Sequence, residues 1–126
     1  MQESLIQYCQ HGGLVHDELL LAFQKLWKQK QKPDAIFAAA DKLTTGCLRI
    51  LKKKKIKVPD EVALIGFSNN DLTELLDPPL SIIKQPAFEM GVAATELLLQ
   101  VIESKRPVTE FETRVLPTEL IIRKSS

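Results

Sequence analysis

The sequence predicts an α/β fold built around a mostly parallel sheet, and two observations lead to that prediction. Short apolar runs of strand length alternate with stretches of roughly 12 to 18 residues whose apolar side chains recur at helical spacing. Prolines and glycines separate several of these segments. Strands that alternate with helices are joined by right-handed crossovers, which place successive strands parallel to one another.

Six segments are expected to be strands. Residues 35–39 form a continuous apolar run, which is typical of a strand buried on both faces of its sheet. The other expected strands are residues 4–8, 62–67, 80–84, 112–115 and 119–122. A loop with a short helix is expected from residue 68 to residue 77, before the two prolines that set up the strand at 80–84.

Three helices are expected, at residues 15–30, 42–54 and 87–104. Pro33 ends the first, because proline disfavours helical geometry in the residue before it. Each helix has one apolar stripe: Leu19, Leu20, Phe23, Leu26 and Trp27 in the first; Leu43, Gly46, Cys47, Ile50 and Leu51 in the second; and Met90, Ala93, Ala94, Leu97, Leu98, Val101 and Ile102 in the third.

The ends of the predicted strands are the candidate binding positions. In open parallel sheets, ligands bind beyond the carboxyl ends of the strands. Those ends carry residues 9–13, Ala40 with Asp41, residues 68–71, and Gln85. Asp41 itself is expected to cap the helix that follows it, since aspartate is common at that position.

The composition is that of one globular domain without strong charge. The chain has 126 residues, of which 44% are hydrophobic, and its net charge is +1. It therefore has no general attraction to nucleic acid, and the four lysines at 52–55 are interpreted as a solvated helix end. No signal peptide and no apolar run of roughly 20 residues is present, so the cytoplasm is the expected location and no membrane contact is predicted.

No enzyme, metal site or cofactor is predicted. Cys9 and Cys47 are far apart in the sequence, which fits neither a zinc site nor a redox pair, and Cys47 is expected to be a small buried hydrophobe. His11 and His16 are interpreted as surface histidines. Residues 66–68 lack the second glycine of a nucleophile elbow, and the chain has no glycine-rich phosphate loop.

Three stretches match one known pattern in order: PDAIFAAAD at residues 33–41, VPDEVALIGF at 58–67 and DPPLSIIKQP at 77–86. EMG at 89–91 and LPTEL at 116–120 extend the match. Together they resemble the effector-binding domain of the LacI/GalR (lac-repressor) family of bacterial transcription regulators, from about residue 5 to residue 123.

The resemblance implies a periplasmic-binding-protein-like type I fold, in which two α/β subdomains are joined by three crossover strands and hold a small molecule between them. Residues 1–85 would then be part of the C-terminal subdomain. Residues 86–115 would form a crossover helix and strand of the other subdomain, and residues 116–126 a return strand. The DNA-binding headpiece and the upstream half of the effector domain are expected to be absent from this chain.

The resemblance also implies four effector contacts. Leu14 stands where the family has a stacking aromatic residue, Ala40 where it has an asparagine, and Ser68 where it often has an aspartate. Only Gln85 matches a family ligand position in residue type. Sugar hydroxyls are recognised by pairing with buried polar groups, so these differences have a chemical consequence. Either the effector is less polyhydroxylated than a simple sugar, or neighbours such as Asn69, Asn70 and Gln10 supply the missing contacts.

By position in the family, the predicted helix at 42–54 and the loop before the two prolines would help to form a dimer. Thr45 and Arg49 are expected to point outward, with Leu76 and its neighbour Leu75 in the interface. The alternative is that both leucines belong to the core. A homo-oligomer is expected, and the apolar stripe at 87–104 suggests that copies associate through that helix, by domain swapping or as a dimer.

Three functions remain open from the sequence. The first is the ligand-sensing and dimerisation part of a LacI-family regulator that controls operator binding by a separate helix-turn-helix. The second is a sugar-binding protein of a transport system, which shares the fold. The third is a phosphoacceptor signalling domain, because Asp41, Ser68 and Lys84 follow strand ends in a suggestive order, although no acidic pair follows the first predicted strand.

Overall fold

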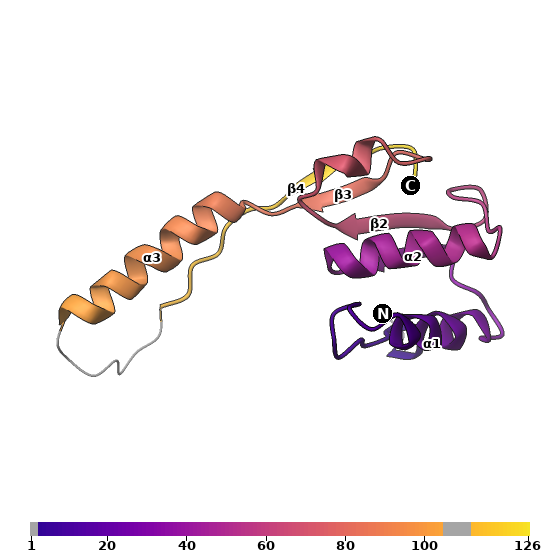
Figure 1. Ribbon diagram of the computed structural model, residues 1–126, viewed down its shortest axis with the longest axis horizontal. Helices are drawn as coiled ribbons and strands as arrows, with labels where there is room; N and C mark the ends of the chain where they lie inside the picture. The colour runs from indigo at the N-terminus through magenta and orange to yellow at the C-terminus, as the bar shows by residue number, and fades with distance from the viewer. Residues whose placement is uncertain (1–2, 105–111) are drawn as a thin grey trace. The chain divides into compact units, whose positions relative to one another are not determined.

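The computed structural model describes residues 3–104 and 112–126 (Figure 1). The helices are α1 (His16–Trp27), α2 (Asp41–Lys53) and α3 (Ala87–Ser104), and the strands are β1 (Ala35–Ala38), β2 (Ala63–Phe67), β3 (Ser81–Lys84) and β4 (Glu119–Ile121). Two short 3-10 helices, η1 (Glu3–Leu5) and η2 (Asp71–Glu74), complete the elements. The chain divides into two compact units, Met1–Lys84 with Leu120–Ser126, and Gln85–Glu119.

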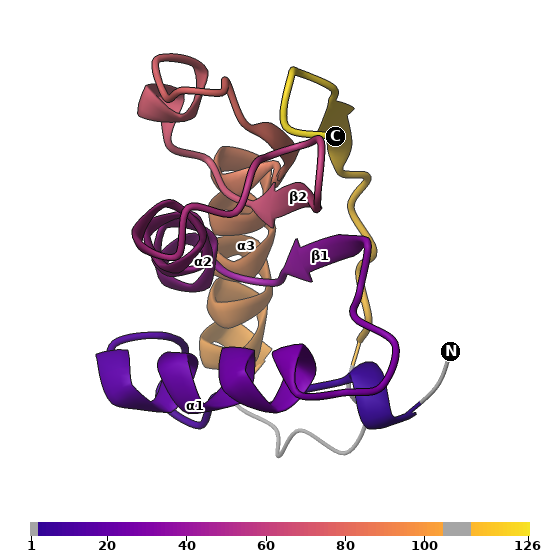
Figure 2. The same cartoon turned by 90° about the vertical axis from the view of Figure 1, so that its right-hand side faces the viewer.

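The strands form one sheet in the order β1-β2-β3-β4. Strand β1 runs parallel to β2, with Phe37 opposite Ile65, and β2 runs parallel to β3, with Gly66 opposite Ile82. Figure 2 shows β1 and β2 side by side, with α2 to one side of them. The predicted α/β class, its parallel sheet and its three helices are therefore confirmed.

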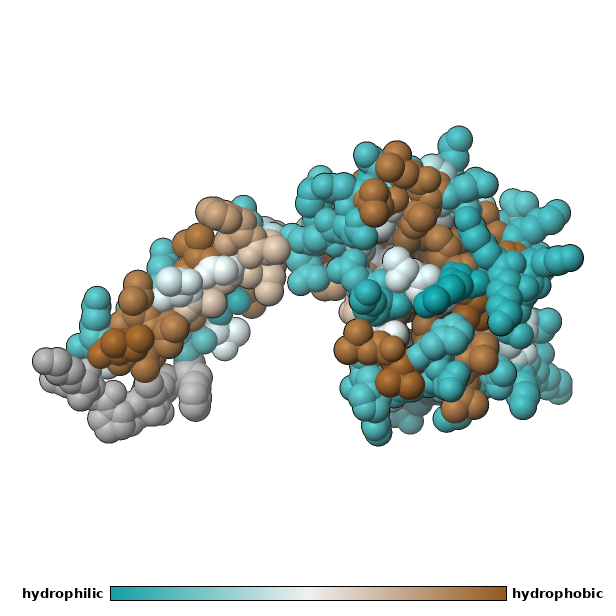
Figure 3. Space-filling view, in the orientation of Figure 1, coloured by the Kyte–Doolittle hydropathy of each residue, from teal (hydrophilic) through white to brown (hydrophobic). Residues whose placement is uncertain are grey.

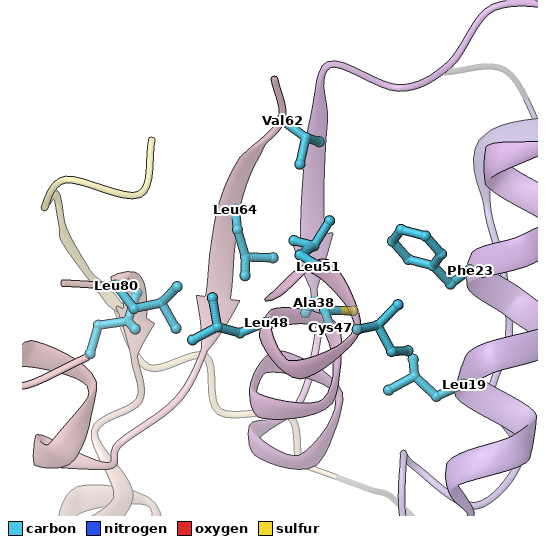
Figure 4. Close-up of a cluster of buried hydrophobic side chains, with 11 residues drawn as sticks. Leu19, Phe23, Ala38, Cys47, Leu48, Leu51, Val62, Leu64 and Leu80 are labelled. Carbon is cyan, nitrogen blue, oxygen red and sulfur yellow. The ribbon is translucent and has the colours of Figure 1, made fainter. Parts of the chain in front are cut away.

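Helix α2 buries one face against the sheet. Figure 4 shows Leu48 and Leu51 of α2 beside Leu64 of β2, while Leu19 and Phe23 reach the same cluster from α1. Burying each such side chain contributes about 1.5–3 kcal/mol. The buried residues of α2 are Thr44, Gly46, Cys47, Leu48, Ile50 and Leu51. Gly46, Cys47, Ile50 and Leu51 confirm most of the predicted stripe of this helix. Leu43 of that stripe is half-buried, whereas the buried Thr44 and Leu48 lie outside it.

The end of the chain is a structural part of the first unit. The buried Ser125 hydroxyl donates to the carbonyl of Leu64 at 2.6 Å and accepts from the backbone N–H of Ser81 at 2.8 Å. The carbonyl of Ser125 also accepts from the N–H of Leu64 at 2.7 Å. Ser125 thus pairs with groups of both β2 and β3, and an apolar side chain at this position would leave the N–H of Ser81 without this partner.

Two predicted strands are wrong. Residues 4–8 form no strand; η1 covers their start, and the N–H of Ile6 bonds to the carbonyl of Glu3 at 3.0 Å. Residues 112–115 are irregular, and Arg114 instead pairs with Glu96 at 2.9 Å and with Glu112 at 2.7 Å. A strand is stable only when a neighbour completes its hydrogen bonds, and a few alternating residues do not show whether that neighbour exists.

Helix α3 is confirmed at both predicted ends, but none of its residues is buried. Figure 3 shows apolar side chains along this helix, which lies at the left of Figure 1. The large exposed apolar residues are Phe88, Met90, Val92, Leu98, Leu99, Val101 and Ile102. Helix α3 therefore carries an exposed apolar surface.

Among the helices within residues 3–104 and 112–126, none has both the length and the hydropathy that crossing a bilayer requires.

Gly66 of β2 provides a test of the packing between α2 and the sheet. A Cβ at this position would overlap Thr44 Cγ2 and lie 2.7 Å from Thr44 Oγ1. Gly66→Ala is expected to lower the free energy of unfolding by about 1–3 kcal/mol, because overpacking a core costs about that much. Gly91→Ala in α3 is the matched control, since its Cβ would meet no atom within 4 Å. Chemical denaturation of both variants gives the comparison, and equal effects would contradict this account.

Candidate functional site

The carboxyl ends of β1 and β2 meet at one edge of the first unit. After β1 the chain passes through Ala40, the N-cap residue of α2, whose backbone is extended and whose side chain makes no cap hydrogen bond. After β2 comes Ser68, which is only 1% exposed and donates from its backbone N–H to the carbonyl of Ile83 at 3.1 Å. Both predicted contacts therefore stand where a parallel sheet offers a ligand site.

Asp41 joins these two strand ends. The predicted cap role of Asp41 is wrong, because Asp41 is the first helical residue and the cap position belongs to Ala40. Its Oδ1 instead accepts a hydrogen bond from the hydroxyl of Ser68. The N–H of Asn70 donates to Ser68 Oγ at 3.1 Å, so the serine hydroxyl has a partner on each side. Sequence reasoning missed this pair, although each member is the first side chain with a polar group after adjacent strands.

The loop before α1 lies against the first turn of α2. A Cβ on Gly13 would come within 2.9 Å of the backbone nitrogen of Leu43, so only glycine fits there. The φ of Gly13 is +87°, a left-handed conformation that glycine adopts without strain. Leu14 follows at once and is 76% exposed. Leu14 thus directly follows a residue that lies against the first turn of α2, and its approach to Ala40 and Ser68 stays a prediction.

Glu18 of α1 holds this loop. Its carboxylate accepts from the backbone N–H groups of Gln10 and His11, the latter at 3.2 Å, and lies 3.4 Å from His11 Nδ1. Burial acts to raise the pKa of Glu18, but the hydrogen bonds from His11 and Gln10 outweigh it and hold the pKa below the usual 4.5. The glycine turn that carries Leu14 is therefore fixed at its start.

Gln85 lies directly after β3 and is half-buried. It is the first residue of the second unit, and its carbonyl accepts from the N–H of Ala87 at the start of α3. Its approach to Leu14, Ala40 and Ser68 stays a prediction.

The residues predicted for a dimer interface differ in exposure. Thr45 and Arg49 are exposed one turn apart on α2, and Thr45 Oγ1 donates to the carbonyl of Asp41 at 3.1 Å. Leu76 packs against the core of the first unit, whereas Leu75 is 75% exposed. Of the two leucines, Leu75 is thus the one that offers apolar surface.

An apolar cavity of about 260 Å³ lies between α1, β1 and the segment that precedes α1. Cys9 and Cys47 both line it, but none of the four predicted effector contacts does. Burial raises the pKa of Cys47 to about 11, with a smaller contribution from Cys9, which confirms Cys47 as a buried and unreactive thiol. Within the part of the chain that the structure describes, no group of three His, Cys, Asp or Glu side chains is placed to hold a metal ion.

The sequence matches the periplasmic binding protein-like domain family over residues 6–126. The HTH-type transcriptional repressor CytR of Escherichia coli (strain K12) is 37% identical over 120 residues, which are 95% of this chain and 35% of CytR. The HTH-type transcriptional repressor PurR of Vibrio parahaemolyticus is 35% identical over 116 residues, which are 90% of this chain and 34% of PurR. The chain thus spans about a third of the length of these relatives.

Solved structures give the same picture. A complex of the transcriptional regulator CelR with cellobiose superposes with a TM-score of 0.81 at 30% identity, over 100% of this chain and 37% of that one. A LacI-family transcriptional regulator from Enterococcus faecalis V583 with bound ribose superposes with a TM-score of 0.69 at 32% identity, over 90% of this chain and 41% of that one.

The Glu18 contact predicts a pH dependence for the loop that carries Leu14. A carboxylate whose pKa is lowered by folding stabilises the loop fully above its unfolded pKa, and the contribution is lost as the pH falls through the folded value. As the pH falls below about 4.5, the amide NMR signals of Gln10 and His11 are expected to shift together. Glu18→Gln should remove this transition, and its persistence in that variant would assign it to another group.

Proposed function

The chain belongs to the periplasmic binding protein-like domain family, and within it to the LacI family of transcription regulators, and from this premise we propose that it senses a small molecule as part of such a regulator. The match over residues 6–126 carries the proposal, because the named relatives are transcriptional repressors. The edge formed by Ala40, Asp41 and Ser68 supports it, since polar groups at strand ends are where this fold type accepts ligands.

The proposed effector is a sugar or a related hydroxylated molecule. The CelR complex contains cellobiose and the Enterococcus regulator contains ribose, which makes this chemical class the first to test. The proposed contacts are Leu14, Ala40, Ser68 and Gln85. Binding needs neither a cofactor nor a catalytic step, and the chain is proposed to act as a non-enzymatic sensor.

Operator binding is proposed to reside in a helix-turn-helix outside this chain. Its near-neutral charge gives it no general attraction to DNA, and its relatives are about three times as long. A regulator of transcription works where the DNA is, so the cytoplasm is the proposed location. Domain boundaries near residues 85 and 115 are proposed as in the family.

A role in sugar transport is not favoured, because the relatives named above are transcriptional regulators. A phosphoacceptor role is not favoured either. The carboxylate of Asp41 already accepts the hydroxyl of Ser68, and no cluster that could hold Mg²⁺ occurs in the described residues.

Self-association is proposed through the exposed face of α2 and the neighbouring loop, with Thr45, Arg49 and Leu76 in the contact. The exposed Leu75 adds apolar area to that surface. Association through α3, including a domain swap, is proposed as a second route, because the large apolar side chains of this helix are exposed.

Ala40 allows a test of ligand recognition. Ala40→Asn and Ala40→Ser both place a capping group at the uncapped start of α2, and each should raise the free energy of unfolding by about 0.5–2 kcal/mol. Only asparagine adds the amide that the family resemblance implies at this position. Ribose and cellobiose titrations followed by NMR should therefore show about tenfold tighter binding for Ala40→Asn alone. Equal affinity in the two variants would contradict a ligand contact at position 40.

Charge reversal on α2 tests the dimer. Arg49→Glu is expected to weaken self-association in sedimentation velocity runs over a range of concentrations, because like charges across an interface repel. Lys25→Glu, an equally exposed position on α1, is the control with the same charge change. A monomer at every concentration in the unmodified chain would exclude this surface as a self-association interface for the chain.

A further inference from the structure

Two pairs of hydrogen bonds, which meet at Asn70, connect the C-terminal segment to the ligand edge. The guanidinium Nη1 of Arg123 donates to Thr73 Oγ1 at 3.1 Å, and that hydroxyl donates to the carbonyl of Asn70 at 2.7 Å. The N–H of the same residue, Asn70, donates to Ser68 Oγ at 3.1 Å, and the Ser68 hydroxyl donates to Asp41 Oδ1. All of these residues belong to the first unit.

Every bond in this series points the same way. It begins at a cation that only donates and ends at a carboxylate that only accepts. Hydrogen bonds aligned head to tail polarise one another. This applies to the two bonds that meet at the Thr73 hydroxyl and to the two that meet at the Ser68 hydroxyl. The carbonyl and the N–H of Asn70 belong to different peptide groups, so Asn70 joins the two pairs through its position, and its carbonyl also accepts from the N–H of Thr73 at 3.1 Å. The hydroxyls of Thr73 and Ser68 have one proton each: Thr73 donates its proton to the carbonyl of Asn70, and Ser68 donates its proton to Asp41.

The middle of the series is buried and its end is exposed. Thr73 is 2% exposed, and Ser68 is as inaccessible, whereas Asp41 is exposed at the start of α2. Arg123 is anchored by a further bond from Nη1 to the carbonyl of Leu80 at 2.8 Å. The buried hydroxyls of Thr73 and Ser68 both have hydrogen-bond partners, and losing one would leave a buried polar group unpaired, which costs more than leaving a solvated one.

We propose that Arg123 is a positioning residue, which acts through Thr73, Asn70 and Ser68 to hold the Asp41 carboxylate as the acceptor for a hydroxyl group of the effector. The family resemblance leads one to expect a carboxylate at position 68. In this chain position 68 is a serine, and the carboxylate comes from the end of the neighbouring strand, held by that serine. Asp41 Oδ2 is the atom assigned to the ligand.

This inference rests on the proposed sensing function and adds a specificity to it. Because the proton of Ser68 is already donated, the pair formed by Asp41 and Ser68 offers acceptors to the ligand rather than donors. It should therefore favour ligands with hydroxyl or amino groups at the contact over ligands with only ether or carbonyl oxygens. Arg123 lies on the segment that returns to the first unit after Glu119. A conformational change of this segment is therefore expected to alter the position of the Asp41 carboxylate at the ligand edge.

Thr73 offers a matched pair of variants for the test. Thr73→Val removes the hydroxyl and keeps the shape of the side chain, whereas Thr73→Ser keeps the hydroxyl and loses a methyl group. In the full chain, Thr73→Val should speed the exchange of the Asn70 amide proton with solvent about tenfold or more, and Thr73→Ser should restore the slow exchange. Thr95→Val is the outside control, since it also removes a hydroxyl bonded to a backbone carbonyl, within α3.

Ligand binding is measured on the same proteins with ribose and cellobiose as probes. Thr73→Val and Arg123→Met should weaken binding about three- to tenfold, and Asp41→Asn about tenfold or more, as for a lost hydrogen bond to a charged group. Arg123→Lys, which retains a donor and the charge, should recover part of the loss. If Arg123→Met does not fold, Thr73→Val and Thr73→Ser still decide the question.

Three outcomes would overturn the inference in different ways. Unchanged sugar affinity in Thr73→Val and Asp41→Asn, with normal binding by the unmodified chain, would overturn it and leave the sensing function standing. Absence of binding of either sugar by the unmodified chain would overturn both together. Equal amide exchange in Thr73→Val and Thr73→Ser would by itself overturn the positioning role of Arg123.

Discussion

Helix α2 packs against the parallel strands β1 and β2, and the geometry of the whole first unit depends on this contact. Thr44 is its closest point: the buried side chain lies over Gly66, and its hydroxyl donates to the carbonyl of Ala40 at 2.8 Å. The same contact fixes where α2 begins. Asp41 therefore meets Ser68 at the carboxyl ends of two adjacent strands.

The C-terminal segment adds the second constraint. Ser125 satisfies backbone groups of β2 and β3, and Arg123 bonds to Thr73 and to the carbonyl of Leu80. These contacts join residues more than forty positions apart in the sequence. Closing such long loops costs chain entropy, which the other contacts of the folded unit offset. The bonds of Ser125 and Arg123 make the last residues part of the scaffold that supports the ligand edge.

Much of the site was within reach of sequence reasoning, since Ala40 and Ser68 were assigned to strand ends from periodicity alone. The bond between Asp41 and Ser68 was not, because Asp41 fitted a helix cap and nothing local indicates that the helix starts one residue earlier. The same limitation explains the two wrong strands. Residues 4–8 and 112–115 have strand-like patterns, but the neighbour that would complete their hydrogen bonds is a tertiary property.

The α/β class, the three helices, the parallel sheet and the family resemblance could all be predicted from the sequence. These follow from periodicity and from motifs that are local in the chain. The pairing of polar groups, the packing of Leu76 rather than Leu75 against the core, and the connection of Arg123 to Asp41 through Asn70 are visible only in the folded chain. Pairing between distant residues depends on distances of a few ångströms, and those distances are set by packing rather than by local propensity.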